Sequence, residues 1–294
     1  MNKSFEDWIK RVALGTVQFG LNYGISNRSG QPNSSEVKRI LDYAKSVGIS
    51  TLDTAINYGE AETILGKVLQ NQSGAFQIIS KFPKETTASA LTETLSNSLG
   101  RLKQKEIYGL LAHSSSSFDN SALIKRLIEE KQKGRIQKIG VSIYSPSEIR
   151  KILDQDIDID LVQLPYNVFD QRFKPLLGDL RRKCIEVHVR SVFLQGLFFL
   201  NPKELPPHFN TVKNKLHKLQ DLAKDLDIPL HALLLNYTLG QSDIDKVVIG
   251  VNTLQELQGN ISAFNYAEET HQIQEVLDSF SEENEEILLP MNWG

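Results

Sequence analysis

The sequence predicts an α/β protein of one domain, a (β/α)8 TIM barrel that occupies residues 1–294. Short runs of β-branched and apolar residues alternate eight times with longer runs of helical period. Successive predicted strands end at regular intervals, roughly 30 residues apart, at Asp53, Lys81, His113 and Val141. Such a βα period indicates parallel strands joined by helical crossovers, and eight of these units close a barrel.

The principal alternative is a doubly wound open sheet, which carries a glycine-rich phosphate loop after its first strand. Here the first predicted strand leads into residues 19–24, Phe-Gly-Leu-Asn-Tyr-Gly, which do not match G-x-G-x-x-G. The chain length would also accommodate two domains of about 150 residues each. Because no linker or low-complexity segment divides the chain, we predict a single barrel.

The predicted strands are short runs rich in Val, Ile and Leu, whereas the helices repeat apolar residues three or four positions apart, as Leu91, Leu95 and Leu99 do. In chain order, the eight strands are predicted at residues 12–19, 50–54, 77–81, 106–112, 138–141, 161–164, 186–192 and 246–249. The helices that follow them are predicted at residues 35–46, 60–70, 86–102, 120–132, 146–153, 173–183, 212–225 with 230–239, and 254–264. A last helix is predicted at residues 271–280.

Capping and turn residues support these boundaries. Ser34 or Ser35 is the expected N-cap of the first helix, and Gly48 and Gly134 stand where two helices end. Pro146 lies in the first turn of a helix, where a missing N–H costs nothing. Residues 197–209 contain three prolines, which predicts an irregular loop after the seventh strand.

Polar side chains at the strand ends form the candidate active site, because barrel enzymes build their sites there. Asp53 ends the second strand with Tyr58 five residues on, Lys81 ends the third, and His113 follows the fourth. A phenol with a pKa near 10 is a weak acid, and a neighbouring cation stabilises its phenolate. We therefore expect Lys81 to lower the pKa of Tyr58 and Asp53 to keep Lys81 charged. His113 is expected to donate a hydrogen bond to a substrate oxygen, so that the set can protonate a carbonyl while a hydride reaches its carbon.

These residues and several others resemble the aldo-keto reductase family. The matching segments are 14–20 (Leu-Gly-Thr-Val-Gln-Phe-Gly), 52–55 (Leu-Asp-Thr-Ala) with Tyr-Gly at 58–59, Ser-Lys at 80–81, His113, 133–136, 139–142 (Ile-Gly-Val-Ser), 162–163 with 166–167, and 257–260. The resemblance implies a (β/α)8 fold and a nicotinamide dinucleotide bound without a Rossmann domain. It also implies a tetrad, with Tyr58 as the general acid beside Asp53, Lys81 and His113.

The resemblance therefore implies a reductase that uses NAD(P)H to convert the aldehyde or ketone of a small molecule into an alcohol. It assigns the following residues to the cofactor: Gly15, Thr16, Ser142, Gln163, Arg190, Ser191, Gly250, Asn252 and Asn260. The family implies NADP(H), whose 2′-phosphate is held by basic residues after the eighth strand. Residues 250–256 contain no Lys or Arg and one acid, Glu256, so NAD(H) stays open as the cofactor.

Two positions depart from the family pattern. Ile143 stands where the family has an asparagine that helps to hold the nicotinamide carboxamide, which leaves that task to Ser142 and Gln163, alone or with Asn167. Arg190 aligns with an aromatic residue that stacks on the nicotinamide ring. A guanidinium also stacks on rings, but it adds a positive charge near the substrate. We therefore expect a polar or anionic substrate, for example a sugar-derived carbonyl compound.

Three other interpretations stay open. The first gives each residue a structural role, such as a buried ion pair of Asp53 and Lys81. The joint occurrence of four such residues at successive strand ends favours catalysis over this interpretation. In the second, the chain is a non-catalytic protein that senses nicotinamide or docks on a partner. In the third, it is a barrel isomerase or aldolase, with Lys81 as a Schiff base.

Composition excludes several further classes. Lys and Arg number 33 against 36 Asp and Glu, a net charge of −3, which gives no drive toward nucleic acid or an anionic membrane. No apolar run approaches the ~18 residues of a membrane span, and residues 1–11 do not resemble a signal peptide, so we expect a cytoplasmic protein. The single cysteine, Cys184, is expected to pack as an apolar side chain, and no metal site is expected. Trp293 is expected to fold back over the substrate or to be loose, and a homo-oligomer stays open.

Overall fold

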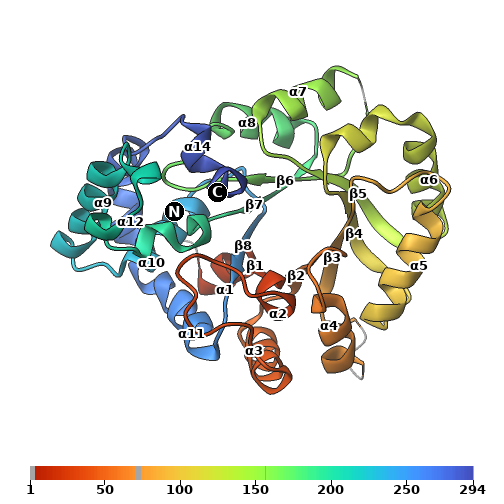
Figure 1. Cartoon of the computed structure of the whole chain (residues 1–294), viewed down its shortest axis with the longest axis horizontal. Helices are drawn as coiled ribbons and strands as arrows, with labels where there is room; N and C mark the ends of the chain where they lie inside the picture. The colour runs from red at the N-terminus through yellow and green to blue at the C-terminus, as the bar shows by residue number, and fades with distance from the viewer. Residues whose placement is uncertain (1–3, 71–73, 156, 294) are drawn as a thin grey trace.

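The computed structural model describes residues 4–70, 74–155 and 157–293, and within them eight parallel strands close into one barrel (Figure 1). Each strand pairs with the next along the chain, and the last strand closes the barrel by pairing with the first. The strands are β1 (Val12–Gly15), β2 (Thr51–Asp53), β3 (Gln77–Phe82), β4 (Ile107–Ala112), β5 (Ile136–Ser142), β6 (Leu161–Pro165), β7 (Glu186–Arg190) and β8 (Lys246–Gly250). The predicted (β/α)8 barrel of one domain is confirmed.

Helices cover the outside of the barrel (Figure 1). The crossover helices are α3 (Ser34–Val47), α4 (Ala61–Leu69), α5 (Leu91–Leu102), α6 (Ser121–Gln132), α7 (Pro146–Asp154), α8 (Lys174–Arg182), α9 (Lys213–Asp225), α10 (Leu230–Leu239) and α11 (Leu254–Ser262). Shorter helices are α1 (Phe5–Ile9), α2 (Val17–Gly20), α12 (Ala267–Gln272), α13 (Gln274–Asp278) and α14 (Glu285–Leu288).

Local sequence explains where the helices begin and end. The N-cap of α3 is Asn33 rather than either predicted serine, because the Asn33 side chain accepts a hydrogen bond from the Glu36 N–H at 3.0 Å. Gly48 ends this helix as predicted, with a left-handed φ of 99°. At the start of α7, the Glu148 carboxylate accepts a hydrogen bond from the Ser145 N–H at 2.8 Å and completes a capping box.

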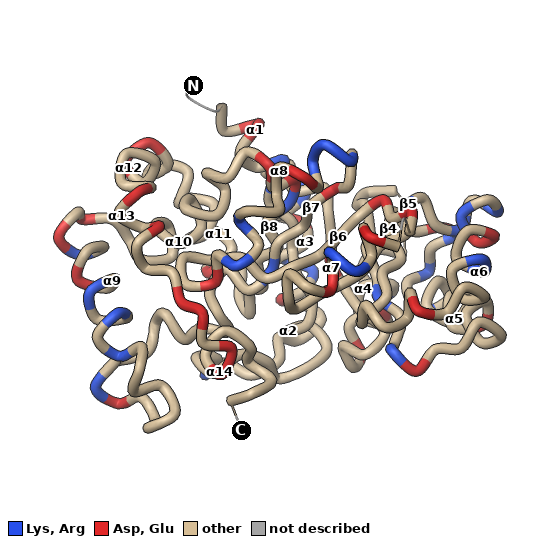
Figure 2. Tube along the Cα trace, turned by 90° about the horizontal axis from the view of Figure 1, so that it is seen from above, with Lys and Arg blue, Asp and Glu red and all other residues tan. Residues whose placement is uncertain are grey.

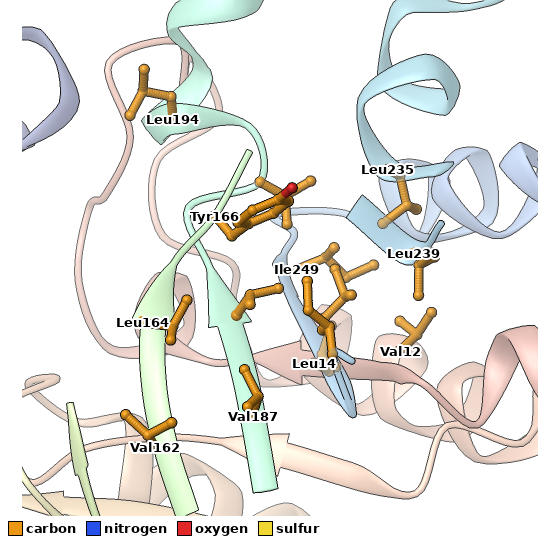
Figure 3. Close-up of a cluster of buried hydrophobic side chains, with 14 of the residues drawn as sticks. Val12, Leu14, Val162, Leu164, Tyr166, Val187, Leu194, Leu235, Leu239 and Ile249 are labelled. Carbon is orange, nitrogen blue, oxygen red and sulfur yellow. The ribbon is translucent and has the colours of Figure 1, made fainter. Parts of the chain in front are cut away.

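The core lies between the barrel and its helices, where the outward-facing strand residues pack (Figure 3). Val162 of β6 lies level with Val187 of β7, and Leu14 of β1 lies level with Ile249 of β8. All four side chains are at most 1% exposed. Figure 3 shows Leu235 of α10 on the same side of the sheet as this group. Burying each such side chain contributes roughly 1.5–3 kcal/mol, so this layer holds the strand ends in place.

The first predicted strand is too long. It was expected over residues 12–19, but β1 ends at Gly15 and the chain turns into the short helix α2. The buried Phe19 explains the difference, because it extends the apolar run of the sequence while it packs from a helical turn.

Two predicted helices also have different boundaries. The helix expected over residues 271–280 is divided at Ile273, whose φ of −109° and ψ of 19° lie outside the helical range, into α12 and α13. The helix expected from residue 86 begins at Leu91, because residues 86–90 form turns closed by hydrogen bonds to Pro83 and Thr87.

The predicted packing of Cys184 is wrong. Cys184 is exposed and has a left-handed φ of 56° in the turn between α8 and β7. Its N–H donates to the Arg181 carbonyl oxygen at 3.0 Å, which fixes the turn at the end of the helix. The thiol therefore stands outside the core.

Acidic and basic residues are interleaved along the outer helices, as Figure 2 shows for α5, α6 and α9. This distribution agrees with the nearly balanced composition. Among the described residues, no helix is both long enough and apolar enough to cross a membrane.

Candidate active site

A cavity of about 790 Å³ opens at the C-terminal ends of the strands. Its volume is typical of sites that take a small molecule or a cofactor. Asp53, Tyr58 and His113 line it together, as their positions at strand ends predict. Other lining segments come from the loop after β1, from residues 190–199 after β7, from residues 248–260 around β8 and from Pro290 and Met291 near the chain end.

Asp53 and Lys81 form a buried ion pair at the edge of this cavity. Lys81 is 1% exposed, and its Nζ donates to both carboxylate oxygens of Asp53 at 2.8 Å and to the Thr54 carbonyl oxygen at 2.9 Å. These three bonds use every N–H of the ammonium group. Burial lowers the pKa of Lys81, and the attraction of Asp53 opposes that shift. An amine held in this way is badly placed to form a Schiff base.

Tyr58 stands in a tight turn after β2. Its ring centroid lies 5.1 Å from Lys81 Nζ. The His113 ring packs edge to face against it, with the two ring centroids 6.2 Å apart. Two glycines make the turn possible: a Cβ on Gly20 would lie 1.8 Å from the Tyr58 carbonyl oxygen, and Gly59 has a left-handed φ of 53°. Within the described ranges, the Tyr58 hydroxyl makes no hydrogen bond to the protein, so it is available to a ligand in the cavity.

The pKa of Tyr58 is raised well above its ordinary value. Burial is the main cause, the Asp53 carboxylate adds to it, and the Arg190 guanidinium opposes it. Tyr58 therefore keeps its proton at neutral pH. The expected net lowering of this pKa is wrong in direction, because loss of hydration and the Asp53 carboxylate outweigh the nearby positive charge.

His113 is a neutral imidazole at pH 7. Burial lowers its pKa to about 4, and the positive charges of Lys81 and Arg190 act in the same direction. One nitrogen of a neutral imidazole donates a hydrogen bond and the other accepts one. The ring can therefore hold a ligand oxygen without adding a charge to the cavity.

The three side chains expected at the nicotinamide carboxamide lie in different places. Ser142 lines the cavity. Gln163 is not among the described lining residues, and its Nε2 donates to Asp53 Oδ1 at 2.7 Å. Asn167 is occupied by its own loop: its Oδ1 accepts hydrogen bonds from the Phe169 and Asp170 N–H groups at 2.9 Å. Ser142 and Gln163 nevertheless lie level on neighbouring strands, whereas the Asn167 side chain holds its own loop.

Arg190 lies in the cavity without an acidic partner among the described residues. Its guanidinium lies 4.1 Å from the centroid of the Tyr144 ring, and one of its NH2 groups donates to the Ile143 carbonyl oxygen at 3.0 Å. Sequence reasoning missed Tyr144, because it lies in a loop and not at a strand end. The guanidinium of Arg190 gives this part of the cavity a positive charge, and its remaining N–H groups are available to a ligand.

The wall between β1 and β8 contains most of the other residues expected to bind a cofactor, namely Gly15, Thr16, Gly250, Asn252 and Asn260. Gly250 makes room for Gln18, because a Cβ there would lie 2.2 Å from the Gln18 amide. Gln18 Oε1 and Asn252 Oδ1 are buried and have no hydrogen-bond partner within the described residues. Two such acceptors on one wall fit a nicotinamide dinucleotide, which offers amide and hydroxyl donors.

The segment after β7 crosses toward the loop after β1. Ser191, Leu194 and Gln195 have left-handed φ angles of 63°, 44° and 51°. The Gln195 carbonyl oxygen accepts a hydrogen bond from the Ile25 N–H at 3.0 Å. Non-glycine residues in this conformation cost free energy and persist where their surroundings hold them, often at functional sites. Ser191, assigned to the cofactor by sequence, lines the cavity.

A protonated tyrosine and a neutral histidine thus lie at the mouth of the closed barrel, beside a buried lysine–aspartate pair. No group of three or more His, Cys, Asp or Glu side chains in the described residues is placed to hold a metal ion. The sequence model of the Aldo/keto reductase family matches residues 11–279, and the chain belongs to this family. Membership supports an enzyme that reduces carbonyl compounds, and the family generally uses nicotinamide cofactors.

Individual relatives are distant but cover most of the chain. The sequence is 25% identical over 302 positions to "Uncharacterized oxidoreductase YqkF" of Bacillus subtilis (strain 168), with 94% of this chain and 98% of that protein covered. It is 26% identical over 267 positions to L-galactose dehydrogenase of Arabidopsis thaliana, with 83% and 82% covered. The structure is similar to that of an aldo-keto reductase from Bacillus halodurans in its holo form, with a TM-score of 0.73, 23% identity and 91% of both chains covered.

Proposed function

We propose that the protein reduces an aldehyde or ketone to an alcohol with NADH or NADPH, and that Tyr58 is the general acid. The observation that carries this proposal is that a protonated Tyr58 and a neutral His113 line one cavity, with their rings 6.2 Å apart. A bound nicotinamide supplies the hydride. Tyr58 Oη gives its proton to the carbonyl oxygen, and His113 holds that oxygen by a hydrogen bond.

Lys81 and Asp53 support the proton transfer without touching the substrate. Tyr58 becomes a phenolate when it gives up its proton, and the Lys81 ammonium 5.1 Å from its ring centroid stabilises that negative charge. Asp53 keeps the ammonium in place through two hydrogen bonds of 2.8 Å. A proton from solvent then restores the phenol, so that each turnover consumes one hydride and one proton.

The test of this mechanism is the Tyr58→Phe variant, which removes the donor hydroxyl and keeps the ring. We expect kcat to fall by about a thousandfold or more, since general acid catalysis contributes roughly 10²–10⁴-fold. Cofactor affinity, measured by fluorescence titration, should change little. Unaltered turnover in this variant would refute the role of Tyr58. A wild-type protein that binds the cofactor and reduces no carbonyl compound would instead favour the non-catalytic sensing protein.

We propose further that the enzyme uses both cofactors, with less than a hundredfold preference for NADPH. Support comes from the cavity wall after β8, where Asn252 and Glu256 line the cavity and residues 250–256 contain no Lys or Arg. The Glu256 carboxylate accepts a hydrogen bond from the Asn252 N–H at 2.7 Å, so this wall carries a negative charge that does not favour a 2′-phosphate. Fluorescence titrations with NADH and NADPH decide the matter.

For the substrate, we propose a polar or anionic carbonyl compound, such as a sugar derivative. The Arg190 guanidinium, which has no acidic partner among the described residues, supports an anionic group. The name of the Arabidopsis relative, L-galactose dehydrogenase, points to sugars. A panel of aldehydes matched in size but differing in charge should show a lower KM for the anionic members. Equal KM values for neutral and anionic aldehydes would show that Arg190 does not recognise the charge of the substrate.

A further inference from the structure

Gln163 contacts the catalytic ion pair from the opposite side of the barrel. It lies on β6, four strands from β2 in a closed barrel of eight, and it is 0% exposed. Its Nε2 donates to Asp53 Oδ1 at 2.7 Å, a short distance that is typical of an N–H bond to a carboxylate. Gln163 is the one of the three expected carboxamide ligands that reaches Asp53.

The Asp53 carboxylate is therefore held from two sides. Lys81 donates to both of its oxygens from β3, and Gln163 donates to Oδ1 from across the barrel. Without Gln163, the ion pair would be anchored at one point, through the bond from Lys81 to the Thr54 carbonyl oxygen beside β2. The bond from Gln163 fixes the carboxylate to the far wall, so the ammonium beside the Tyr58 ring is fixed as well.

The backbone around Gln163 is itself well fixed. Gln163 lies level with Ser142 of β5 on one side and with His188 of β7 on the other. Its carbonyl oxygen accepts a hydrogen bond from the Ile143 N–H at 2.9 Å. Because the strand holds the start of the side chain, the amide loses little further conformational freedom when it binds Asp53.

We propose that Gln163 is a positioning residue, which holds Asp53 against Lys81 and thereby keeps the ammonium group beside Tyr58. This inference rests on the proposed function, in which Tyr58 is the acid. It gives the donor end of the Gln163 amide a task within the tetrad, whereas the family resemblance gives this residue to the cofactor.

The neighbouring His188 provides a matched control. Gln163 Oε1 and both ring nitrogens of His188 are buried and lack hydrogen bonds within the described residues, and the His188 Nε2 lies 3.6 Å from Glu186 Oε1, away from the ion pair. Gln163→Met therefore removes one hydrogen bond, the one to Asp53, and keeps a side chain of similar length. His188→Phe removes a buried polar side chain from the next strand at the same level, and it leaves Asp53 and Lys81 with all their bonds.

The first measurement is independent of turnover. We expect the Lys81 ammonium to give an ¹H–¹⁵N signal that its three hydrogen bonds protect from exchange with water, and loss of this signal in Lys81→Met assigns it. We expect exchange to be at least about tenfold faster in Gln163→Met and unchanged in His188→Phe. In Gln163→Met, kcat should fall about 10- to 100-fold, as expected for loss of a hydrogen bond to a charged group. The Kd of NADH is measured on the same variant, so that positioning of Asp53 is separated from cofactor binding.

Two outcomes overturn the proposal. One is a Kd for NADH that rises about tenfold while the ammonium signal stays protected, which makes Gln163 a cofactor ligand. The other is an equal effect of His188→Phe on the ammonium signal, which shows a general disturbance of the barrel interior. A wild-type protein without reductase activity refutes the proposed function alone, because the exchange measurement needs no substrate.

A second variant keeps the test decisive if Gln163→Met does not fold. Gln163→Glu has the same shape, and its protonated carboxyl can donate to Asp53 in place of the amide. Two adjacent carboxyl groups share one proton at low pH and repel each other once both are ionised. We expect its kcat to approach that of wild type at low pH and to fall at least tenfold as pH rises. A kcat that follows the wild-type profile at every pH contradicts the positioning role.

Discussion

His113 carries a neutral ring because its surroundings penalise a positive charge. Burial lowers its pKa to about 4, and Lys81 and Arg190 add to the effect. In the unfolded chain an imidazole has a pKa near 6.5. Between these two values the unfolded state binds a proton that the folded state does not, so folding stability falls as the pH falls from about 6.5 to about 4.

This linkage gives a stability prediction. Between pH 7 and pH 4.5, the free energy of unfolding should fall by about 2 kcal/mol more in the native protein than in His113→Asn, because the variant lacks the titrating ring. Urea unfolding at the two pH values measures the difference. An equal fall in the free energy of unfolding for the two proteins would show that the pKa of His113 is not lowered in the folded state.

At the residue scale, Tyr58 and Lys81 show which properties of the site can be predicted from the sequence and which cannot. Their places at neighbouring strand ends follow from the βα period, so the sequence predicted that the tetrad lies together. The direction of the Tyr58 pKa shift did not follow, because it depends on burial and on the charges of Asp53 and Arg190 around the phenol. The bond of Gln163 to Asp53 is a contact across the barrel, which local patterns do not encode.

At the scale of elements, the turn that carries Tyr58 depends on close backbone contact with α2. A Cβ on Gly20 would lie 1.8 Å from the Tyr58 carbonyl oxygen and 2.5 Å from the Ala61 nitrogen, and backbone atoms cannot give way as a flexible side chain can. The turn and the short helix are therefore a single unit, although the sequence predicted α2 as part of a strand.

We expect Gly20→Ala to displace this unit. Overpacking against fixed atoms costs about 1–3 kcal/mol, and a shift of Tyr58 by about 1 Å lowers kcat by about a hundredfold. Gly100→Ala is the control, because Gly100 lies in α5 with no neighbour within 4 Å of its ideal Cβ. That variant should gain about 0.5–1 kcal/mol of stability from helix propensity and keep wild-type kcat. Thermal melts and steady-state kinetics on both variants test the contrast, and equal behaviour of the two would count against it.

Element types were predictable along most of the chain, and the errors lie where side-chain packing overrides local pattern. The strands β3 to β6 were predicted because their apolar runs are bounded by turn residues and face helices on one side. The break at Ile273 was not predicted, since no glycine or proline marks it and the apolar spacing continues through it.

At the scale of the whole molecule, the end of the chain returns to the cavity. Trp293 does not lie over the cavity itself: its ring meets Phe209 edge to face at 5.1 Å, and its Nε1 donates to the Ile287 carbonyl oxygen at 3.0 Å. This contact joins the loop after β7 to the last residues. Pro290 and Met291, which precede Trp293, line the cavity, and Met291 is 61% exposed.

Trp293→Ala should loosen this part of the wall. Loss of the ring contact and the hydrogen bond frees residues 290–293, so we expect KM for bulky carbonyl substrates to rise about tenfold, with little change in kcat or in NADH affinity. The residues of the tetrad keep their contacts in this variant. A panel of small and bulky aldehydes checks the prediction, and a uniform loss of kcat for every substrate would contradict it.

The position of Cys184 has a practical consequence. It is the single cysteine of the chain, it is exposed, and it stands just before β7 begins, whereas the cavity opens where β7 ends. A thiol-reactive fluorophore or spin label will therefore attach at one known point, at the opposite end of the barrel from the residues that line the cavity. The native sequence thus provides a spectroscopic handle for following unfolding or self-association without any engineered residue and without interference from ligands.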